Sequence, residues 1–524
     1  MRMQFIKNHI YFLLFIFSVT TFSSCDESLN QHYAVDSKVV SDKSLWDKIQ
    51  SNPNLSKFAQ ILKNAGYDKI LSASQMYTVW APDDAALADF DATAMDSAML
   101  VKEFISNHIG RFSYSASGNI EEKVSVLNEK FIVFKTVGAD FYFGDAKLTQ
   151  RNEVAYNGIL HIVNKRVAFF NNIWEYLEKD QRLDSIRKYF YAFDQIIFDE
   201  KKSIPGDVNA QGKTVYLDSV FYNANVLFKT LGSFTDEDST YTVILPTNTA
   251  WINSYNKIKG NFRYYANGST VTQYMADTLQ RHYTTSALVQ DAAFSPKWQG
   301  STQDSLVSTH GNTFLNPQYL FEGAEKIVTS NGNIYLTNEL KYNLWESWGK
   351  KIIVEAETVL GRVNTLSSIY TRSADGSYIT GISGKKYVDI TPSSSSSNPT
   401  ISFDIPNTLS GCAYNIYCVF VPASATNLDT KDLKPCKVNF QLTYLKESGA
   451  FGIQIFDNGG QSFITDKANL SKVLVASNFT FPYCNYGQEI VNVKLKVVSN
   501  VPQIQTTLFT RELLIDCIIL EPVH

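Results

Sequence analysis

Four short blocks of sequence recur, in the same order, across the first two thirds of this 524-residue chain. The pairs are 45–49 with 173–177, 77–84 with 241–248, 104–108 with 278–282, and 157–161 with 331–335. Self-similarity in a fixed order indicates repeated copies of one folding unit. The first two blocks start 32 residues apart in copy one and 68 apart in copy two, so copy two carries about 36 extra residues, within 201–239. We expect this insertion, with its strand-like run 213–217, to form a hairpin or a lid.

The local pattern of each copy mixes helices with strands. In copy one, apolar residues between 55 and 65 follow a helical spacing, and Gly66 is a typical C-terminal stop. Residues 77–80 form a short β-rich run that Pro82 ends, and 159–163 form another after an Asn-Gly turn. The repeated unit is therefore predicted to be an α+β domain.

Two boxes within the repeat resemble the signatures of fasciclin domains. Tyr-Thr-Val-Trp-Ala-Pro-Asp-Asp-Ala-Ala at 77–86 is similar to the first box of that family, and Asn-Gly-Ile-Leu-His-Ile-Val at 157–163 is similar to the second. Copy two departs from the pattern, since Ile-Leu stands at 244–245 and Tyr335 replaces the His of the second box. The resemblance covers roughly residues 42–340.

This resemblance implies two compact β-wedges flanked by helices. They would span residues 43–170 and 171–345, the second with its insertion near 201–239. The family is associated with adhesion and extracellular binding, so the resemblance implies a binding function through protein or glycan contacts. The two boxes are mostly apolar, so they indicate the fold more than a ligand site.

The histidines give little support for catalysis. His108 and His282 fall at equivalent places in the aligned blocks, where the family has a Tyr-His-like position, and we interpret each as lying on a partly buried helix face and satisfying one backbone group. His161 is replaced by Tyr335 in copy two, so the unit does not depend on it. No metalloprotease, nucleophile-elbow, phosphate-loop or dinucleotide motif occurs. We therefore predict no enzyme, with an uncharacterised hydrolase using paired carboxylates as the alternative.

The last part of the chain differs in composition. All seven Trp lie at or before Trp348, and short alternating strands such as 400–405 and 491–498 follow. The Ser-rich run 391–400 is typical of a flexible loop. Spaced short strands with turn residues between them predict a β-sandwich over residues 350–524.

Two segments of this part resemble the opening and closing strands of carbohydrate-binding, galactose-binding-like jelly rolls. They are 351–358, which contains Glu-Ala-Glu, and 514–520, which contains an Asp. The resemblance implies a structural calcium held by Glu355, Glu357 and Asp516, because calcium prefers several oxygen ligands. The alternative is that the glutamates, which share one strand face, are solvated.

Aromatic side chains commonly stack on sugar rings, and this part has no Trp. The tyrosines Tyr370, Tyr378 and Tyr387 are the candidates, and we interpret each as core or strand surface. The sequence assigns no ligand-binding residue.

The first 25 residues have the layout of an export signal. Basic residues precede an apolar run at 10–17, which is shorter than the about 20 residues that cross a bilayer, and small residues lead to Cys25. The segment ending at Cys25 resembles a bacterial lipobox, with Phe22 where Leu is usual. The resemblance implies that residues 1–24 are removed and that Cys25 is lipidated.

Residues 25–42 form a linker that begins with acidic residues. Asp-Glu after the lipidated Cys resembles a surface-export signal in some Gram-negative lipoproteins, whereas in others Asp there retains the protein at the inner membrane. We expect a lipid anchor on the exposed face of the outer membrane, with an extracellular protein or glycan as partner. The alternative is an accessory glycan-binding lipoprotein of an outer-membrane transporter complex for polysaccharide uptake. A net charge of −4 without basic stripes argues against nucleic acid.

The remaining cysteines gather in the last quarter of the chain: Cys412, Cys418, Cys436, Cys484 and Cys517. Their number is odd, so at least one is unpaired within the chain. An exported protein can form disulfides, but the sequence leaves the pairing open. No Cys-x-x-Cys pair occurs, which argues against zinc.

Overall fold

The computed structural model describes residues 41–295, 298, 300, 303–374, 379–425, 433–488 and 491–523. The predicted signal peptide, Cys25 and the linker up to residue 40 lie outside these residues. Unit 1 of the chain comprises the part up to Asn172 with Thr235–Ser239 and Thr329–Asn331. Unit 2 comprises Ile173–Phe234, Thr240–Val328 and the part from Gly332. No helix among the described residues is long and apolar enough to cross a membrane.

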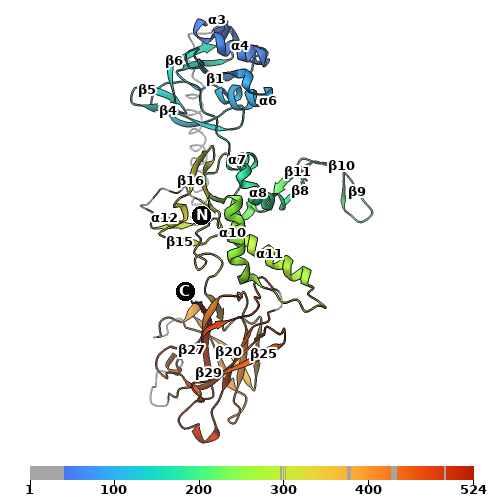
Figure 1. The fold of residues 1–524 in the computed structure, drawn as a ribbon, viewed down its shortest axis with the longest axis vertical. Coiled ribbons are helices and arrows are strands. Elements are labelled where there is room, and N and C mark those ends of the chain that lie inside the picture. Colours follow the sequence, from blue (N-terminus) through green and yellow to red (C-terminus); the bar gives the residue numbers. More distant parts are fainter. Residues whose placement is uncertain are drawn as a thin grey trace, which may run out of the picture. The chain divides into compact units, whose positions relative to one another are not determined.

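Unit 1, blue to cyan in Figure 1, combines short helices with one seven-stranded sheet. The helices are α3 (Leu45–Ser51), α4 (Ser56–Asn64), α5 (Tyr67–Ser72) and α6 (Ser97–Met99). The strands are β1 (Tyr77–Pro82), β2 (Ile109–Arg111), β3 (Glu121–Ser125), β4 (Phe131–Val137), β5 (Asp140–Phe143), β6 (Ala146–Ala155) and β7 (Gly158–Val163), in the order β2-β1-β7-β6-β5-β4-β3. The two family-like boxes form β1 and β7, which pair in parallel.

The β1–β7 pair separates two apolar cores. On one side, Val79 and Leu160 pack with the helices; on the other, Trp80 packs with Phe134 and stacks on Phe143 at 3.8 Å between ring centroids. Strands that are buried on both faces carry continuous apolar runs rather than alternating ones. This explains why both boxes are almost entirely apolar.

Local signals start α3 and end α4, and the predicted helix stop at Gly66 is confirmed. The backbone N–H of Asp47 donates to Ser44 Oγ, and that of Ser44 donates to Asp47 Oδ2, each at 3.0 Å, so a capping box starts α3. Gly66 follows α4 with φ +78°, a left-handed conformation that glycine adopts without a steric penalty.

The second copy, in unit 2, repeats the central strand pair. Its helices are α7 (Ile173–Lys179), α8 (Asp184–Tyr191), α9 (Phe228–Leu231), α10 (Asn248–Ile258), α11 (Gln273–Val289) and α12 (Gln318–Phe321). A four-stranded sheet has the order β13 (Ala293–Phe294), β12 (Tyr241–Pro246), β17 (Gly332–Thr337) and β16 (Glu325–Thr329), and β14 (Ser305–Val307) pairs with β15 (Thr313–Leu315). Tyr241 pairs with Gly332 as Tyr77 pairs with Gly158, so the repeat of these two boxes is confirmed in register.

The predicted equivalence of His108 and His282 is wrong. Val79 pairs with Ile109 in copy one, and its counterpart Val243 pairs with Ala293 in copy two. The residue before Ala293, not His282, therefore corresponds to His108. The equal spacing from His to Asn-Gly in the two copies was misleading. His282 is exposed on α11, well before β13, whereas the chain from β13 to the Asn-Gly turn is shorter than the corresponding chain in copy one.

The insertion forms two successive antiparallel pairs, as the hairpin prediction requires. β8 (Asp194–Phe198) pairs with β11 (Phe221–Asn225), and between them β9 (Ile204–Val208) pairs with β10 (Thr214–Asp218). The predicted run 213–217 is β10. The paired segment begins before residue 201, so the sequence comparison placed its start a few residues late.

The last part of unit 2 is a β-sandwich, orange to red in Figure 1. One six-stranded sheet contains β18 (Ile352–Glu355), β20 (Ser367–Ser373), β21 (Lys386–Pro392), β23 (Ala413–Phe420), β27 (Ser471–Thr480) and β29 (Leu513–Pro522). The other contains β19 (Arg362–Thr365), β22 (Thr400–Asp404), β24 (Lys437–Leu445), β25 (Phe451–Phe456), β26 (Phe463–Ile464) and β28 (Lys494–Ser499). Alternate residues such as Ile390, Ile416, Phe403 and Phe440 from both sheets share one core. The predicted strands 400–405 and 491–498 correspond to β22 and β28.

The five cysteines of the sandwich are all buried thiols, and none forms a disulfide. Burial raises the pKa of each of these thiols. They fill core space as small apolar side chains rather than as cross-links.

Candidate functional site

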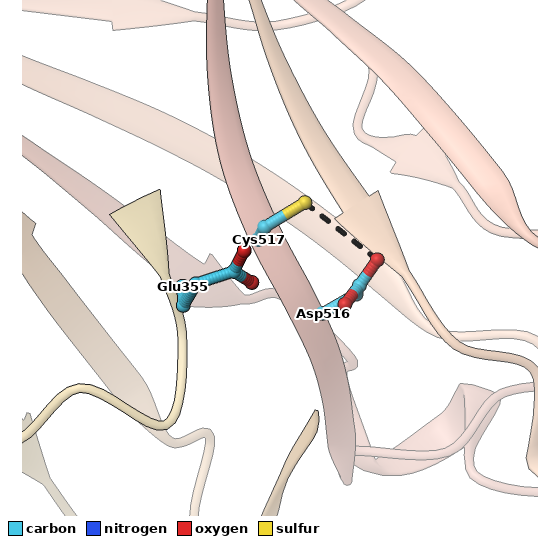
Figure 2. A group of neighbouring side chains, drawn as sticks. All are labelled: Glu355, Asp516 and Cys517. Atoms are coloured by element: carbon cyan, nitrogen blue, oxygen red, sulfur yellow. Dashed lines mark hydrogen bonds between the residues drawn. The ribbon is translucent and has the colours of Figure 1, made fainter. Parts of the chain in front are cut away.

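A cluster of acidic side chains lies where β18 meets β29 (Figure 2). Glu355, at the end of β18, pairs with Cys517 of β29. Asp516 lies in an irregularity of the β23–β29 pairing, where Val419 pairs with Cys517 and Phe420 with Ile515. An extra residue of this kind redirects its side chain out of the regular alternation. The bulge thus brings Asp516 toward Glu355.

The turn around Ser383 closes the cluster. The Ser383 N–H donates to both carboxylate oxygens of Asp516, at 3.0 and 3.2 Å, and its hydroxyl donates to Glu355 Oε1. The neighbouring Gly384 has φ +55°, and a Cβ there would lie 3.4 Å from Glu357 Oε1. The structure therefore brings together Glu355 and Asp516, two of the three residues that the sequence nominated for calcium. Glu357 lies beside the same turn, but it is not in the group whose donor atoms all lie within 4.8 Å of one another.

The cluster carries more negative charge than its hydrogen bonds satisfy. Glu355 Oε2 and Glu357 Oε2 are buried and lack a hydrogen-bond partner among the described residues. Burial, and then the charges of Glu355 and Glu357, raise the pKa of Asp516 to about 6, although the Ser383 N–H opposes the shift. Buried carboxylates without enough donors are stabilised by a proton or by a cation.

Cys517 adds a sulfur that the sequence analysis did not include. Its Sγ, a Glu355 oxygen and an Asp516 oxygen all lie within 4.8 Å of one another, and the thiol donates to Asp516 Oδ2 at 3.6 Å. Burial raises the pKa of Cys517, so the group is a thiol and not a thiolate. A protonated sulfur is a poor metal ligand, whereas carboxylates suit hard cations. The donor set thus fits calcium better than zinc.

The two buried histidines of unit 1 are fully used by the backbone. His108 Nδ1 donates to Phe104 O at 2.7 Å, and its Nε2 accepts from the Val167 N–H at 3.1 Å. His161 Nε2 donates to Tyr114 O at 2.9 Å, and its Nδ1 accepts from the Asn152 N–H at 3.2 Å. Burial lowers the pKa of both to about 4, so both are neutral at pH 7. Each is a structural residue.

A second carboxyl pair was missed by the sequence analysis. Arg372 donates from Nε and Nη2 to Asp389 Oδ2, at 3.0 and 2.7 Å. Burial, and then a hydrogen bond with Asp389, raise the pKa of Glu512 to about 7. The three residues come from separate segments of the chain, so no motif could reveal them. Glycosidases hold their two carboxyls about 5 Å or more apart, whereas a hydrogen-bonded pair is closer.

Two of the candidate tyrosines of the sandwich, Tyr370 and Tyr387, lie in the part of the chain that the structure describes. Tyr387 is buried, and Tyr370 is half exposed on β20 with the Arg372 guanidinium 5.2 Å from its ring. Both match the interpretation as core or strand surface. Tyr378 lies outside the described residues.

Residues 53–167 match the model of the fasciclin domain family. The matched part contains both boxes of copy one, and it is similar to fasciclin domains. A comparison with curated proteins finds no match.

Solved structures resemble parts of the chain at low identity. A fasciclin domain pair of the insect cell adhesion molecule fasciclin I is 13% identical, covers 56% of this chain and 99% of its own, and has a TM-score of 0.22. A xylan-binding domain from Paenibacillus barcinonensis Xyn10C is 11% identical, covers 33% of this chain and 93% of its own, and has a TM-score of 0.21. A carbohydrate esterase of a Shiga toxin-encoding bacteriophage is 13% identical, with coverages of 33% and 98% and a TM-score of 0.19. Values this low transfer no function.

Proposed function

We propose that this protein is a non-catalytic binding protein, anchored by lipid at Cys25 on the outer face of the cell, that contacts an extracellular glycan or protein. The observation that carries the proposal is the fasciclin domain at residues 53–167 with all its signature groups in structural roles. Its boxes are buried strands and its histidines bond the backbone. Such a domain acts through its surface and not through a reaction centre.

The acidic cluster of the sandwich supports a second part of the proposal. Glu355, Glu357 and Asp516 would hold a structural calcium, which would supply the positive charge that the two unpartnered glutamate oxygens lack. The ion would tie β18, the Ser383 turn and β29 together. Its role would be to fix the start and the end of the sandwich, not to perform chemistry.

A panel of oligosaccharides and extracellular proteins tests the binding function, using the soluble chain from residue 26 onward. Binding to a glycan or to a surface protein supports the proposal, whereas binding to neither contradicts it. A parallel screen for hydrolysis products tests the non-catalytic part. Turnover that Glu512→Gln abolishes would replace the proposal with a hydrolase.

A further inference from the structure

The second copy and the sandwich join through the segment before α11. The Arg263 N–H donates to Ser410 Oγ at 2.9 Å, and the Arg263 carbonyl accepts from the Cys484 N–H at 2.8 Å. Tyr264 Oη donates to the Tyr486 carbonyl at 2.7 Å. Phe262 and Trp348 belong to the same core as the sandwich strands. These contacts lie within unit 2 and fix the geometry of the junction.

A cavity of about 340 Å³ opens at this junction. One wall is aromatic: the rings of Tyr265 and Tyr483 lie 5.1 Å apart at an angle of 60°. The Arg263 guanidinium lies 4.8 Å from the Tyr483 ring and pairs with Glu447 at 2.9 Å. This wall therefore presents aromatic ring surface to the cavity, and the positive charge of the neighbouring Arg263 is compensated by Glu447.

Another part of the lining is polar and comes from one face of α11. Gln273, Asp277 and Gln280 follow one another at helical spacings of four and three residues, and all line the cavity. Gln273 Nε2 donates to Asp277 Oδ1 at 2.8 Å, and Gln280 Nε2 donates to the Lys259 carbonyl at 3.0 Å. These bonds orient the side chains and leave Asp277 Oδ2 and the glutamine carbonyls to accept from a ligand.

We propose that this cavity is the glycan site of the protein and takes one or two units of a neutral oligosaccharide; this rests on the proposed binding function. Sugar rings present apolar C–H faces to aromatic walls and hydroxyls to planar carboxylate and amide groups. The volume is at the small end of ligand pockets, which span roughly 300–1,000 Å³. The neutralised Arg263 provides little attraction for an anionic sugar.

The site needs both parts of unit 2. Tyr483 belongs to the sandwich, whereas Tyr265 and the polar wall belong to the second copy. Tyr265 also packs onto the sandwich, since a Cβ on Gly449 would fall 1.9 Å from its ring. The sandwich by itself lacks most of the lining, so it is not the ligand-binding part.

Calorimetric titration of the soluble chain with xylohexaose, cellohexaose, maltohexaose and other neutral oligosaccharides tests the site. Asp277→Asn and Tyr483→Ala are expected to weaken binding at least tenfold. Asp277 is exposed, so its variant keeps the fold, and circular dichroism checks the second variant. The matched controls are Tyr274→Ala, 75% exposed on the same helix but outside the cavity, and Asp457→Asn, exposed on the sandwich.

The outcomes separate the site from the function. If an oligosaccharide binds equally to wild type and to both cavity variants, the site is wrong while glycan binding stands. Loss of binding in Tyr370→Ala instead would move the site to the outer face of β20. If no oligosaccharide binds the wild type, glycan binding and the site fail together, and the protein panel decides whether the proposed binding function survives.

Discussion

Gly158 lies directly against the carbonyl oxygen of Tyr77, where a Cβ would fall 1.8 Å from that oxygen. Gly332 has the same relation to Tyr241, at 1.9 Å, and both glycines have φ near +150°. Each contact lies at the first residue pair of the parallel strands. In both copies, the backbone of the first box lies so close to the second box that only glycine, which has no Cβ, fits at this position.

Replacing these glycines with alanine should separate the strand pairs. Gly158→Ala is expected to destabilise unit 1, and Gly332→Ala unit 2, each by at least about 3 kcal/mol, because backbone must move to admit a Cβ. Calorimetry of the soluble chain measures both. Gly260→Ala is the control, since a Cβ there meets nothing within 4 Å. An unfolding midpoint unchanged in Gly158→Ala would contradict the argument.

The central strands were predictable because their signals are local. Residues 77–82 and 158–163 are buried runs bounded by Pro82 and the Asn-Gly turn, so the sequence contains the start, the end and the burial. The position of His282 was not predictable in this way. Its alignment relied on the number of residues between the His and the Asn-Gly turn. That number includes both part of a helix and the chain that follows it, and these two lengths can change independently.

In the candidate site, too, some residues could be predicted from local sequence and others depend on tertiary structure. Glu355, Glu357 and Asp516 were nominated through resemblance, because two of them lie in the opening segment and the third in the closing segment. The expectation that both glutamates share a strand face is wrong, since β18 ends at Glu355 and Glu357 lies in the turn after it. Ser383 could not be named, because its turn reaches the cluster only through tertiary structure. The cavity at Tyr265 and Tyr483 has no sequence signal either, since its walls are far apart in the chain.

Unit 2 is expected to unfold as one body. Phe262 and Trp348 pack into the core of the sandwich, so unfolding the segments that carry them also disrupts the sandwich core. Calorimetry should show two transitions rather than three. Phe262→Ala should lower the free energy of unfolding of unit 2 by about 3–5 kcal/mol and leave the unit 1 transition unchanged. Phe58→Ala should affect only the unit 1 transition. A third transition, unaffected by either variant, would show that the sandwich folds independently.

The proposed lipidation at Cys25 predicts where the protein is found. Cys25→Ser removes the acceptor thiol, so the full-length variant should leave the membrane fraction while its two calorimetric transitions remain unchanged. Fractionation with immunoblotting measures the first effect. Cys484→Ser, which changes a buried thiol, is the control that should stay membrane-bound. Membrane retention of Cys25→Ser would mean that another segment anchors the chain.

Calcium should stabilise unit 2 and not unit 1. Binding to the folded state alone contributes about 2.7 kcal/mol at a calcium concentration of about 100 Kd. The unit 2 midpoint is expected to fall on adding a chelator, and Asp516→Asn or Glu357→Gln should remove this response. Asp457→Asn, an exposed acid of the same sandwich, should preserve it. Equal midpoints with calcium and with chelator would refute the proposed site.

The sign of the pH dependence distinguishes a bound cation from a bound proton. Burial raises the pKa of Asp516 from 3.8 to about 6, so without calcium the folded state binds the extra proton and unit 2 loses stability as pH rises through 6. Calcium requires the ionised carboxylate, so the calcium-induced rise in the unit 2 midpoint should be larger at pH 7 than at pH 5.

Glu512, with a pKa raised to about 7, changes the stability of unit 2 in the same direction as Asp516. The comparison is therefore made in Glu512→Gln with and without Asp516→Asn. The buried histidines, whose pKa values are lowered to about 4, have the opposite effect but belong to unit 1, which should lose stability as pH falls below 6.5. A calcium response that is equal at both pH values would mean that Asp516 is not a ligand.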